Sequence, residues 1–312
     1  MKISYISFVI CLLLIGCNQE NRLNMYDNNK KINFESIMIF KDTPAWDLAK
    51  AVDKENLSKI KRIIEKDSTL LDYQEPRYGM TVLMRAIATE KYNSTKALLQ
   101  LGANPNSKAY SGLTVLSYAV SFSWYDRRAN QNPRFVKLLL EYGADPNVPY
   151  PTRTVEAVGY TIQYWYSPLM DATGIEKAKL LVEYGADINY KTELHETAAI
   201  VALRMGSIFG RDEVAYYLIV EKKAKITDPY FFYSLTSDTI EWSKPLYPVD
   251  LLVENWYFDI GTEQHRRKMA IVDEFKRQGI DYAERKNNIS EIMLRHIKIN
   301  HPKDWKTFIE QY

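Results

Sequence analysis

The sequence predicts an all-α fold in which helix-turn-helix units stack into a solenoid. A five-residue turn pattern occurs at 102–106, 143–147 and 185–189, and each copy follows a leucine-rich stretch typical of a helix end. A second pattern, glycine and threonine before apolar residues, starts at Gly79 and again 33 residues later at Gly112. A period of this length indicates a repeat protein, in which each unit buries its apolar face against its neighbours.

Each residue type in these motifs has a local role. Thr81, Thr114, Ser167 and Thr197 stand at helix starts, where a hydroxyl oxygen can accept hydrogen bonds from free N–H groups. Pro168 follows one of them, at a position where a missing N–H costs little. The glycine of each turn should adopt the left-handed conformation that ends a helix, and the Asn and Asp residues should shape the turn.

Weaker units extend the pattern in both directions. The sequence Asp-Thr-Pro at 42–44 should cap a first helix that runs through Val52. Near 212–224, Lys223 replaces the turn glycine, and His195 occupies the glycine position of another unit. A sixth unit is expected from 248 to 281, followed by closing helices at 290–299 and 305–312.

Together these motifs resemble the ankyrin repeat, whose units open with G-x-T-P-L-H-x-A and close with L-L-L-x-x-G-A-D-x-N. The resemblance covers residues 42–226 well and 227–282 poorly. It implies an all-α ankyrin-repeat solenoid of about five to six units, with β-finger loops and atypical end caps. The repeat domain should therefore span 42–282, with 227–282 as a degenerate last unit, and 283–312 should form capping helices.

The first residues have the pattern of a secretory signal, with Lys2 followed by an apolar run at 6–15. That run is too short to span a bilayer, which takes about 20 residues. The sequence Leu-Ile-Gly before Cys17 resembles the bacterial lipobox, which implies a signal peptide at 1–16, lipidation of Cys17 and a flexible tether through 41. An ordinary secretory signal is the alternative. Because Asn18 is not Asp, the Gram-negative sorting pattern implies an outer membrane lipoprotein facing the periplasm.

Two aromatic-rich insertions interrupt the repeat period. One adds eight residues between two helices near 121–133, and the other adds twelve to the finger loop between Asn147 and Ser167. Tyr, Trp and Arg dominate protein–protein contacts because each buries a large area and keeps a polar group. The alternative is that these aromatics fold back over the stack. With the shorter finger tips included, the candidate partner-binding residues are Arg77, Tyr78, Tyr110, Trp124, Tyr125, Tyr160, Tyr164, Trp165 and Tyr190.

The composition points away from catalysis and from nucleic-acid binding. Lys and Arg total 41 against 39 Asp and Glu, for a formal net charge of +2, so no large field draws the chain toward nucleic acid. The sequence has no glycine-rich phosphate loop, no G-x-S-x-G and no H-E-x-x-H. We predict no catalytic residue, no metal site and no cofactor.

We therefore predict a lipid-anchored periplasmic protein-binding module without enzyme activity, acting as a monomer or in a 1:1 complex. Bacterial ankyrin lipoproteins that look similar include immunity proteins, which implies a partner such as a type VI secreted phospholipase toxin. An alternative is an envelope scaffold or stress-protection protein that organises another periplasmic enzyme. A further alternative is an unfamiliar enzyme site in 227–312.

Overall fold

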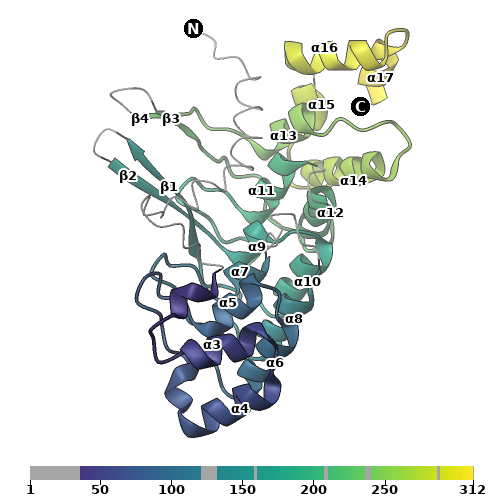
Figure 1. The fold of residues 1–312 in the computed structure, drawn as a ribbon. Coiled ribbons are helices and arrows are strands. Elements are labelled where there is room, and N and C mark those ends of the chain that lie inside the picture. The colour runs from purple at the N-terminus through teal and green to yellow at the C-terminus, as the bar shows by residue number, and fades with distance from the viewer. Residues whose placement is uncertain are drawn as a thin grey trace. The chain divides into compact units, whose positions relative to one another are not determined.

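The computed structural model describes residues 36–120, 132–157, 160–206, 210–235, 240–286 and 289–311. Within these ranges the chain is mostly helical and has two short two-stranded sheets (Figure 1). The predicted all-α fold class with β-finger loops is confirmed. The predicted signal peptide, Cys17 and residues 18–35 of the tether lie outside the described residues.

The described chain divides into two compact units. Residues 36–152 and 164–187 form what we call the N-terminal unit, and residues 153–163 and 188–311 form the C-terminal unit. The tip of the long finger loop is therefore grouped with the C-terminal unit. The predicted boundaries of signal peptide, tether, repeat domain and capping helices stay predictions.

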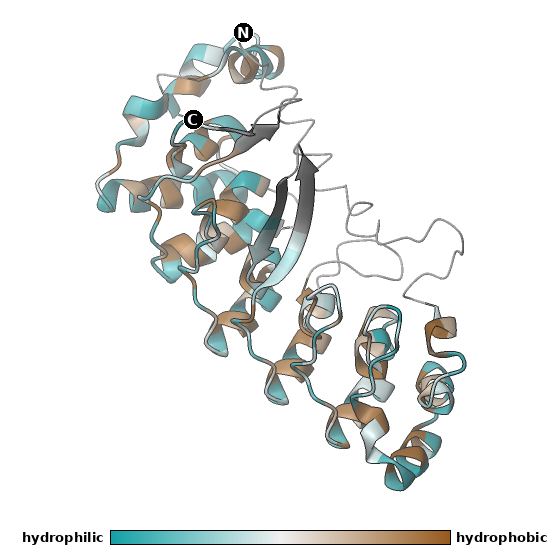
Figure 2. Ribbon diagram, turned by 90° about the vertical axis from the view of Figure 1, so that its left-hand side faces the viewer, coloured by the Kyte–Doolittle hydropathy of each residue, from teal (hydrophilic) through white to brown (hydrophobic). Residues whose placement is uncertain are grey.

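Four helix pairs build the N-terminal unit. They are α3 (Trp46–Asp53) with α4 (Leu57–Lys66), α5 (Val82–Ala88) with α6 (Tyr92–Gln100), α7 (Ser117–Val120) with α8 (Arg134–Glu141), and α9 (Pro168–Asp171) with α10 (Ile175–Glu183). Two short 3-10 helices, η1 (Ile37–Phe40) and η2 (Ser68–Leu71), flank the first pair. The first helices pack on one another in chain order, and α4 packs on α6 as α8 does on α10 (Figure 2). Each pair thus buries its apolar residues against the next pair.

Helix starts follow the sequence prediction at three of five positions. The hydroxyl oxygens of Thr81, Thr114 and Thr197 accept hydrogen bonds from backbone N–H groups three residues later. Ser167 makes no such bond; the N–H of Met170 donates to its carbonyl oxygen at 3.0 Å. The expected cap at 42–44 is also wrong: Ala45 precedes α3, and the Thr43 hydroxyl donates to the carbonyl oxygen of Phe40 at 2.7 Å.

Helix ends confirm the predicted left-handed turn residues. Gly102, Gly143 and Gly185 have φ angles of +99°, +86° and +89°. Lys223, predicted to replace a turn glycine, has a φ angle of +60°, and His195, which stands where Gly79 and Gly112 precede a capping threonine, has a φ angle of +61°. Since an L-residue with a side chain adopts this conformation at a cost of roughly 1–2 kcal/mol, the repeat geometry imposes it on both.

An asparagine in each turn joins that turn to the next one. Asn106 accepts a hydrogen bond from the N–H of Asp145 at 2.8 Å and donates to the carbonyl oxygen of Gly143 at 2.9 Å. Asn147 repeats both bonds one unit later, at 2.7 and 2.8 Å. These side chains set the spacing at which successive finger loops leave the stack.

The C-terminal unit continues with two further helix pairs and a second hairpin. Its elements are α11 (Ala198–Met205), α12 (Arg211–Tyr216) with a π-helical turn (Tyr217–Glu221), β3 (Tyr233–Leu235), β4 (Ile240–Trp242), α13 (Pro248–Asn255), α14 (Glu263–Arg277), α15 (Tyr282–Lys286), α16 (Glu291–Asn300) and α17 (Trp305–Gln311). Strands β3 and β4 are antiparallel, with Tyr233 opposite Trp242. The described residues thus contain six helix pairs from α3 to α14, and the closing helices α15, α16 and α17 follow (Figure 1).

Trp256 anchors the two helix pairs of the C-terminal unit to each other. Its side chain is fully buried, and its indole N–H donates to the carbonyl oxygen of Leu203 at 2.7 Å, at the end of α11. The buried ammonium of Lys268, from α14, donates to the carbonyl oxygen of Trp256 at 3.0 Å. Closing helices α16 and α17 share a separate small cluster around Met293, Ile297 and Phe308.

Candidate protein-binding surface

The first finger, residues 75–80, is held by one buried carboxylate. Glu75 is fully buried, and its two oxygens accept hydrogen bonds from the N–H groups of Arg77, Tyr78 and Met80 at 2.8, 2.7 and 3.0 Å. This arrangement places Arg77 and Tyr78 at the tip. The guanidinium of Arg77 lies 5.6 Å from the centre of the Tyr78 ring and remains exposed. The tip is therefore rigid in its backbone and accessible in its side chains.

The second finger interlocks with the first. The N–H of Tyr110 donates to the carbonyl oxygen of Tyr78 at 2.9 Å. The amide of Gln74 donates to the carbonyl oxygens of Gly79 and Lys108 at 2.8 and 2.6 Å. The Tyr110 ring lies over Gly79 so closely that a Cβ there would be 2.7 Å from two ring carbons, yet Tyr110 is 62% exposed. The structure thus brings three of the predicted residues, Arg77, Tyr78 and Tyr110, onto one surface.

The long finger is the hairpin of β1 (Tyr150–Ala157) and β2 (Tyr160–Tyr166). Tyr164 and Trp165 are half-buried at its base, and the side chain of Tyr160 is not among those described. Tyr150, another aromatic of this insertion, is fully buried, and its hydroxyl donates to the Asp171 carboxylate at 3.0 Å. Part of the aromatic excess therefore belongs to the core, as the alternative interpretation of the insertion expected.

The described structure does not assign the remaining predicted residues to this surface. Trp124 and Tyr125 lie outside the described residues. Tyr190 belongs to the C-terminal unit and is half-buried; burial raises its pKa, and the charge of Glu193 adds to the rise.

Asp228 forms an ion-pair cluster in the same unit as Tyr190. Its carboxylate lies 2.6 Å from the ammonium of Lys191 and 2.9 Å from that of Lys225. Hydrogen bonds from these two lysines lower the pKa of Asp228 to about 2. Lys191, at a finger tip, is therefore engaged within the chain.

The first helices of the units offer little contact surface. Every residue of α5, α7 and α9 is buried. Arg85, which occupies the fourth position after the capping threonine, is paired with Asp53 at 2.8 Å. Tyr118 stands at the same position one unit later, and burial raises its pKa, with a further contribution from Glu75. In the N-terminal unit, the exposed aromatic and cationic side chains of the predicted set therefore lie on the finger tips.

Sequence reasoning missed the second hairpin, β3–β4. Its Trp242 is 61% exposed. A spacing signal was available: 20 residues separate Asn147 from Ser167 around the first hairpin, and 20 separate Thr227 from Tyr247 around the second. Because each interval ends immediately before a proline that starts a helix, the two insertions occupy equivalent positions in their units.

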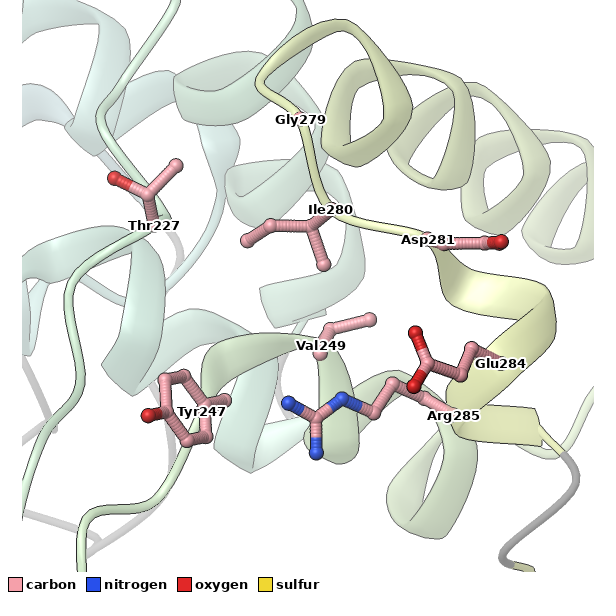
Figure 3. A pocket seen from close by; sticks show the side chains of 8 residues that line it. All are labelled: Thr227, Tyr247, Val249, Gly279, Ile280, Asp281, Glu284 and Arg285. Carbon is pink, nitrogen blue, oxygen red and sulfur yellow. The ribbon is translucent and has the colours of Figure 1, made fainter.

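A small pocket lies beside the turn that follows α14 (Figure 3). It has a volume of about 210 Å³. Arg285 lies 5.0 Å from the Tyr247 ring centre and 3.9 Å from Asp250, whose pKa burial raises and Arg285 lowers in part. Carboxylates and a guanidinium line the same small space, so its charge does not select one class of ligand. The lining residues are Thr227, Tyr247, Val249, Gly279, Ile280, Asp281, Glu284 and Arg285.

The histidines of the described chain serve local packing. His195 contacts Phe231 edge to face, and His301 stacks on Phe308 with ring centres 3.9 Å apart. Across the described ranges, no group of three or more His, Cys, Asp or Glu side chains is arranged to hold a metal ion. None of the helices in that part of the chain is both long and apolar enough to cross a membrane.

Comparisons with known proteins identify the repeat. Residues 48–150 match the model for ankyrin repeats in three copies. A protein of Acanthamoeba polyphaga mimivirus, named for its ankyrin repeats, is 28% identical over 168 residues, which cover 54% of this chain and 20% of that protein. This chain thus spans about a fifth of that relative's length. The crystal structure of the human ASB11 ankyrin repeat domain matches 73% of this chain and 82% of that domain, with 20% identity and a TM-score of 0.47.

Proposed function

Because residues 48–150 are ankyrin repeats, which serve as protein–protein interaction modules, we propose that this chain binds another protein and acts by covering a site on it. The interlocked finger tips carry the proposal. They expose Tyr110 and Arg77 on a backbone that hydrogen bonds already hold in place. A preformed surface loses little conformational entropy on binding, so more of the contact energy appears as affinity.

We extend the proposal to a location on the cell envelope. The support is the sequence of the first residues, in which Lys2 and a short apolar run precede Leu-Ile-Gly-Cys17. A diacylated Cys17 would hold the protein at the membrane, since each buried CH₂ contributes about 0.8 kcal/mol. Metabolic labelling with an alkyne fatty acid tests this step: wild type should be labelled, Cys17→Ser should not, and labelling of both would refute it.

The partner we propose is an antibacterial toxin, such as a phospholipase delivered by a type VI secretion system. The support is the resemblance to bacterial ankyrin lipoproteins, some of which are immunity proteins. In this role the finger tips would occlude the toxin within the periplasm, and no chemistry by the chain itself would be needed.

Competition between strains tests the immunity role. A strain lacking the gene should be killed by siblings that deliver the toxin encoded beside it, and the wild-type gene should restore survival. A Tyr110→Ala/Arg77→Ala variant should restore survival poorly. The matched control Tyr142→Ala/Lys137→Ala, which changes α8 and the residue that follows it, should restore survival fully. Unchanged survival of the deletion strain would refute immunity. Co-purification of a housekeeping envelope enzyme would then favour the scaffold function.

A further inference from the structure

The outer sides of α4 and α6, the second helices of the first two helix pairs, carry an excess of positive charge. α4 contains four cations and one carboxylate, Glu65, and the one charged residue of α6 is Lys96. Because Ile60 and Ile64 of α4 are buried, that helix turns its charged side to solvent. Four of the five cations are exposed, and we call them the cationic face: Lys61, Arg62, Lys66 and Lys96.

Few carboxylates offset this charge. Glu65 lies 3.8 Å from Lys61, whereas the other three residues of the cationic face form no ion pair with any part of the chain that the structure describes. Asp67, directly after α4, is exposed and accepts hydrogen bonds from the backbone N–H and the hydroxyl of Thr69. Five cations against these two carboxylates leave an excess of three positive charges.

The segments around the cationic face are balanced in charge. The turns that lead into α4 and α6 each hold one lysine and one glutamate, Lys54-Glu55 and Glu90-Lys91. With the buried Lys177 set aside, α8 and α10 together contain three cations and three carboxylates. Among the second helices of the N-terminal unit, the excess therefore belongs to the first two.

The composition of the cationic face fits a lipid surface better than a protein surface. The exposed residues of α4 and α6 include no aromatic side chain, and the large apolar one among them is Leu57, at 44% exposure. Protein–protein binding depends on a few aromatic and arginine side chains in well-packed centres. Anionic headgroups, by contrast, attract a cluster of Lys and Arg without a shaped pocket, and each basic residue near the bilayer strengthens the attraction.

The place of these helices in the chain agrees with a lipid partner. α3 and α4 are the first helices of the repeat after Cys17, the residue that we propose carries the lipid anchor. Even if fully extended, residues 17–36 would span at most about 70 Å, so the anchor would keep the first helix pairs close to the bilayer. Such tethering raises the effective concentration of headgroups, and weak electrostatic contacts then suffice.

We propose that the cationic face binds the headgroups of anionic phospholipids such as phosphatidylglycerol, and so lays α4 and α6 against the bilayer. This inference rests on the proposed location at the cell envelope and adds the surface that contacts the membrane. Arg77 and Tyr110, at the finger tips, belong to loops and not to these helices. Binding of lipid and binding of a protein partner would therefore use different residues.

Co-sedimentation with vesicles tests the lipid preference. The full chain carrying Cys17→Ser is mixed with vesicles of phosphatidylcholine alone, or of phosphatidylcholine and phosphatidylglycerol in equal parts. The apolar run at 6–15 is common to all variants, so the preference is measured as the ratio of the two partition coefficients. This ratio should be at least about tenfold at low salt and should decrease as salt is added. Equal partition into both kinds of vesicle would overturn the proposal.

A triple variant places the binding on the cationic face. Arg62→Gln/Lys66→Gln/Lys96→Gln should lower the preference for phosphatidylglycerol by about tenfold or more, because three basic residues near the bilayer are lost. Circular dichroism confirms that the variant is folded. Binding of a glutamate-rich peptide together with no preference between the two lipids would indicate an acidic protein as partner and would overturn the proposal.

The matched control removes three exposed lysines from the C-terminal unit. Lys244→Gln/Lys276→Gln/Lys303→Gln has the same loss of charge, and it should change the preference by less than about twofold, since attraction to the bilayer falls off within a Debye length. Equal effects of the two triple variants would overturn the assignment to α4 and α6.

The outcome is separable from that of the proposed envelope location. If fatty-acid labelling shows that Cys17 is modified but the vesicles show no preference, the anchor stands and the cationic-face proposal fails. If the preference depends on the cationic face while Cys17 stays unlabelled, the lipid-binding surface stands and the anchor fails.

Discussion

Glu75→Ala removes the carboxylate that organises the first finger. The resulting decrease in the free energy of unfolding can be estimated one hydrogen bond at a time. The N–H of Met80 is buried and donates to Glu75 at 3.0 Å. Left without a partner, such a donor costs about 1–3 kcal/mol. The N–H groups of Arg77 and Tyr78 are partly buried, at 2.8 and 2.7 Å from the carboxylate, and can regain water. Each of these should lose about 1 kcal/mol.

The free energy of unfolding should therefore fall by about 3–5 kcal/mol in Glu75→Ala. Glu75→Gln should lose less, because one oxygen remains for the N–H groups of Tyr78 and Met80. Its amide group would, however, place a donor opposite the N–H of Arg77. Urea denaturation followed by circular dichroism measures both variants.

Glu65→Ala is the control for this estimate. Glu65 is 60% exposed and lies 3.8 Å from Lys61, a geometry for which the expected loss is below about 0.5 kcal/mol. A loss under about 1 kcal/mol in Glu75→Ala, or one equal to that of the control, would refute the role assigned to the buried carboxylate.

Three further changes test neighbouring features. Asn147→Ala should lower the free energy of unfolding by about 1–2 kcal/mol, because both hydrogen bonds to the next turn are lost. In urea titrations Asn147→Asp should be no more stable than Asn147→Ala, since a carboxylate cannot donate to the carbonyl oxygen of Gly185. Gly79→Ala should cost at least about 1 kcal/mol, since φ is +68° and the new methyl overlaps the Tyr110 ring; adding Tyr110→Ala should cost less than the sum of the two, and full additivity would contradict the contact. Asp228 has a pKa of about 2 against an ordinary 3.8, so its stabilising effect should be complete above about pH 4 and be lost between pH 4 and 2. Carbon-13 NMR should show this titration, and Lys191→Gln should raise the pKa.

The repeat could be predicted from the sequence because its signals are local. A left-handed residue is required at two places in the repeat, after the second helix and two positions before the capping threonine, so both places are recognisable even where Lys223 and His195 occupy them. The same holds for Thr81, whose hydroxyl accepts from an N–H three residues away. Such requirements depend on a few neighbouring residues, and the sequence contains all of them.

The candidate surface was predicted only in part. Tyr110 and Tyr150 both occur in finger loops, yet the first is 62% exposed and the second fully buried. The difference comes from a distant partner, since the Tyr150 hydroxyl donates to Asp171, 21 positions later. The second hairpin was missed for a related reason. Its loop matches no repeat motif, and the length of that loop indicates an insertion only when it is compared with the loop that contains the first hairpin.

By itself the sequence determined the unit length, the turn positions and the aromatic character of the insertions, because these depend on short-range backbone requirements and composition. The tertiary structure alone decided which of those aromatics stay at the surface and which carboxylates are withdrawn from it. Glu75 illustrates the distinction. Its charge is visible in the sequence, but its burial arises when the finger folds around it and supplies three N–H donors. No local pattern records the burial of that one carboxylate, because the packing of the folded chain controls solvent access.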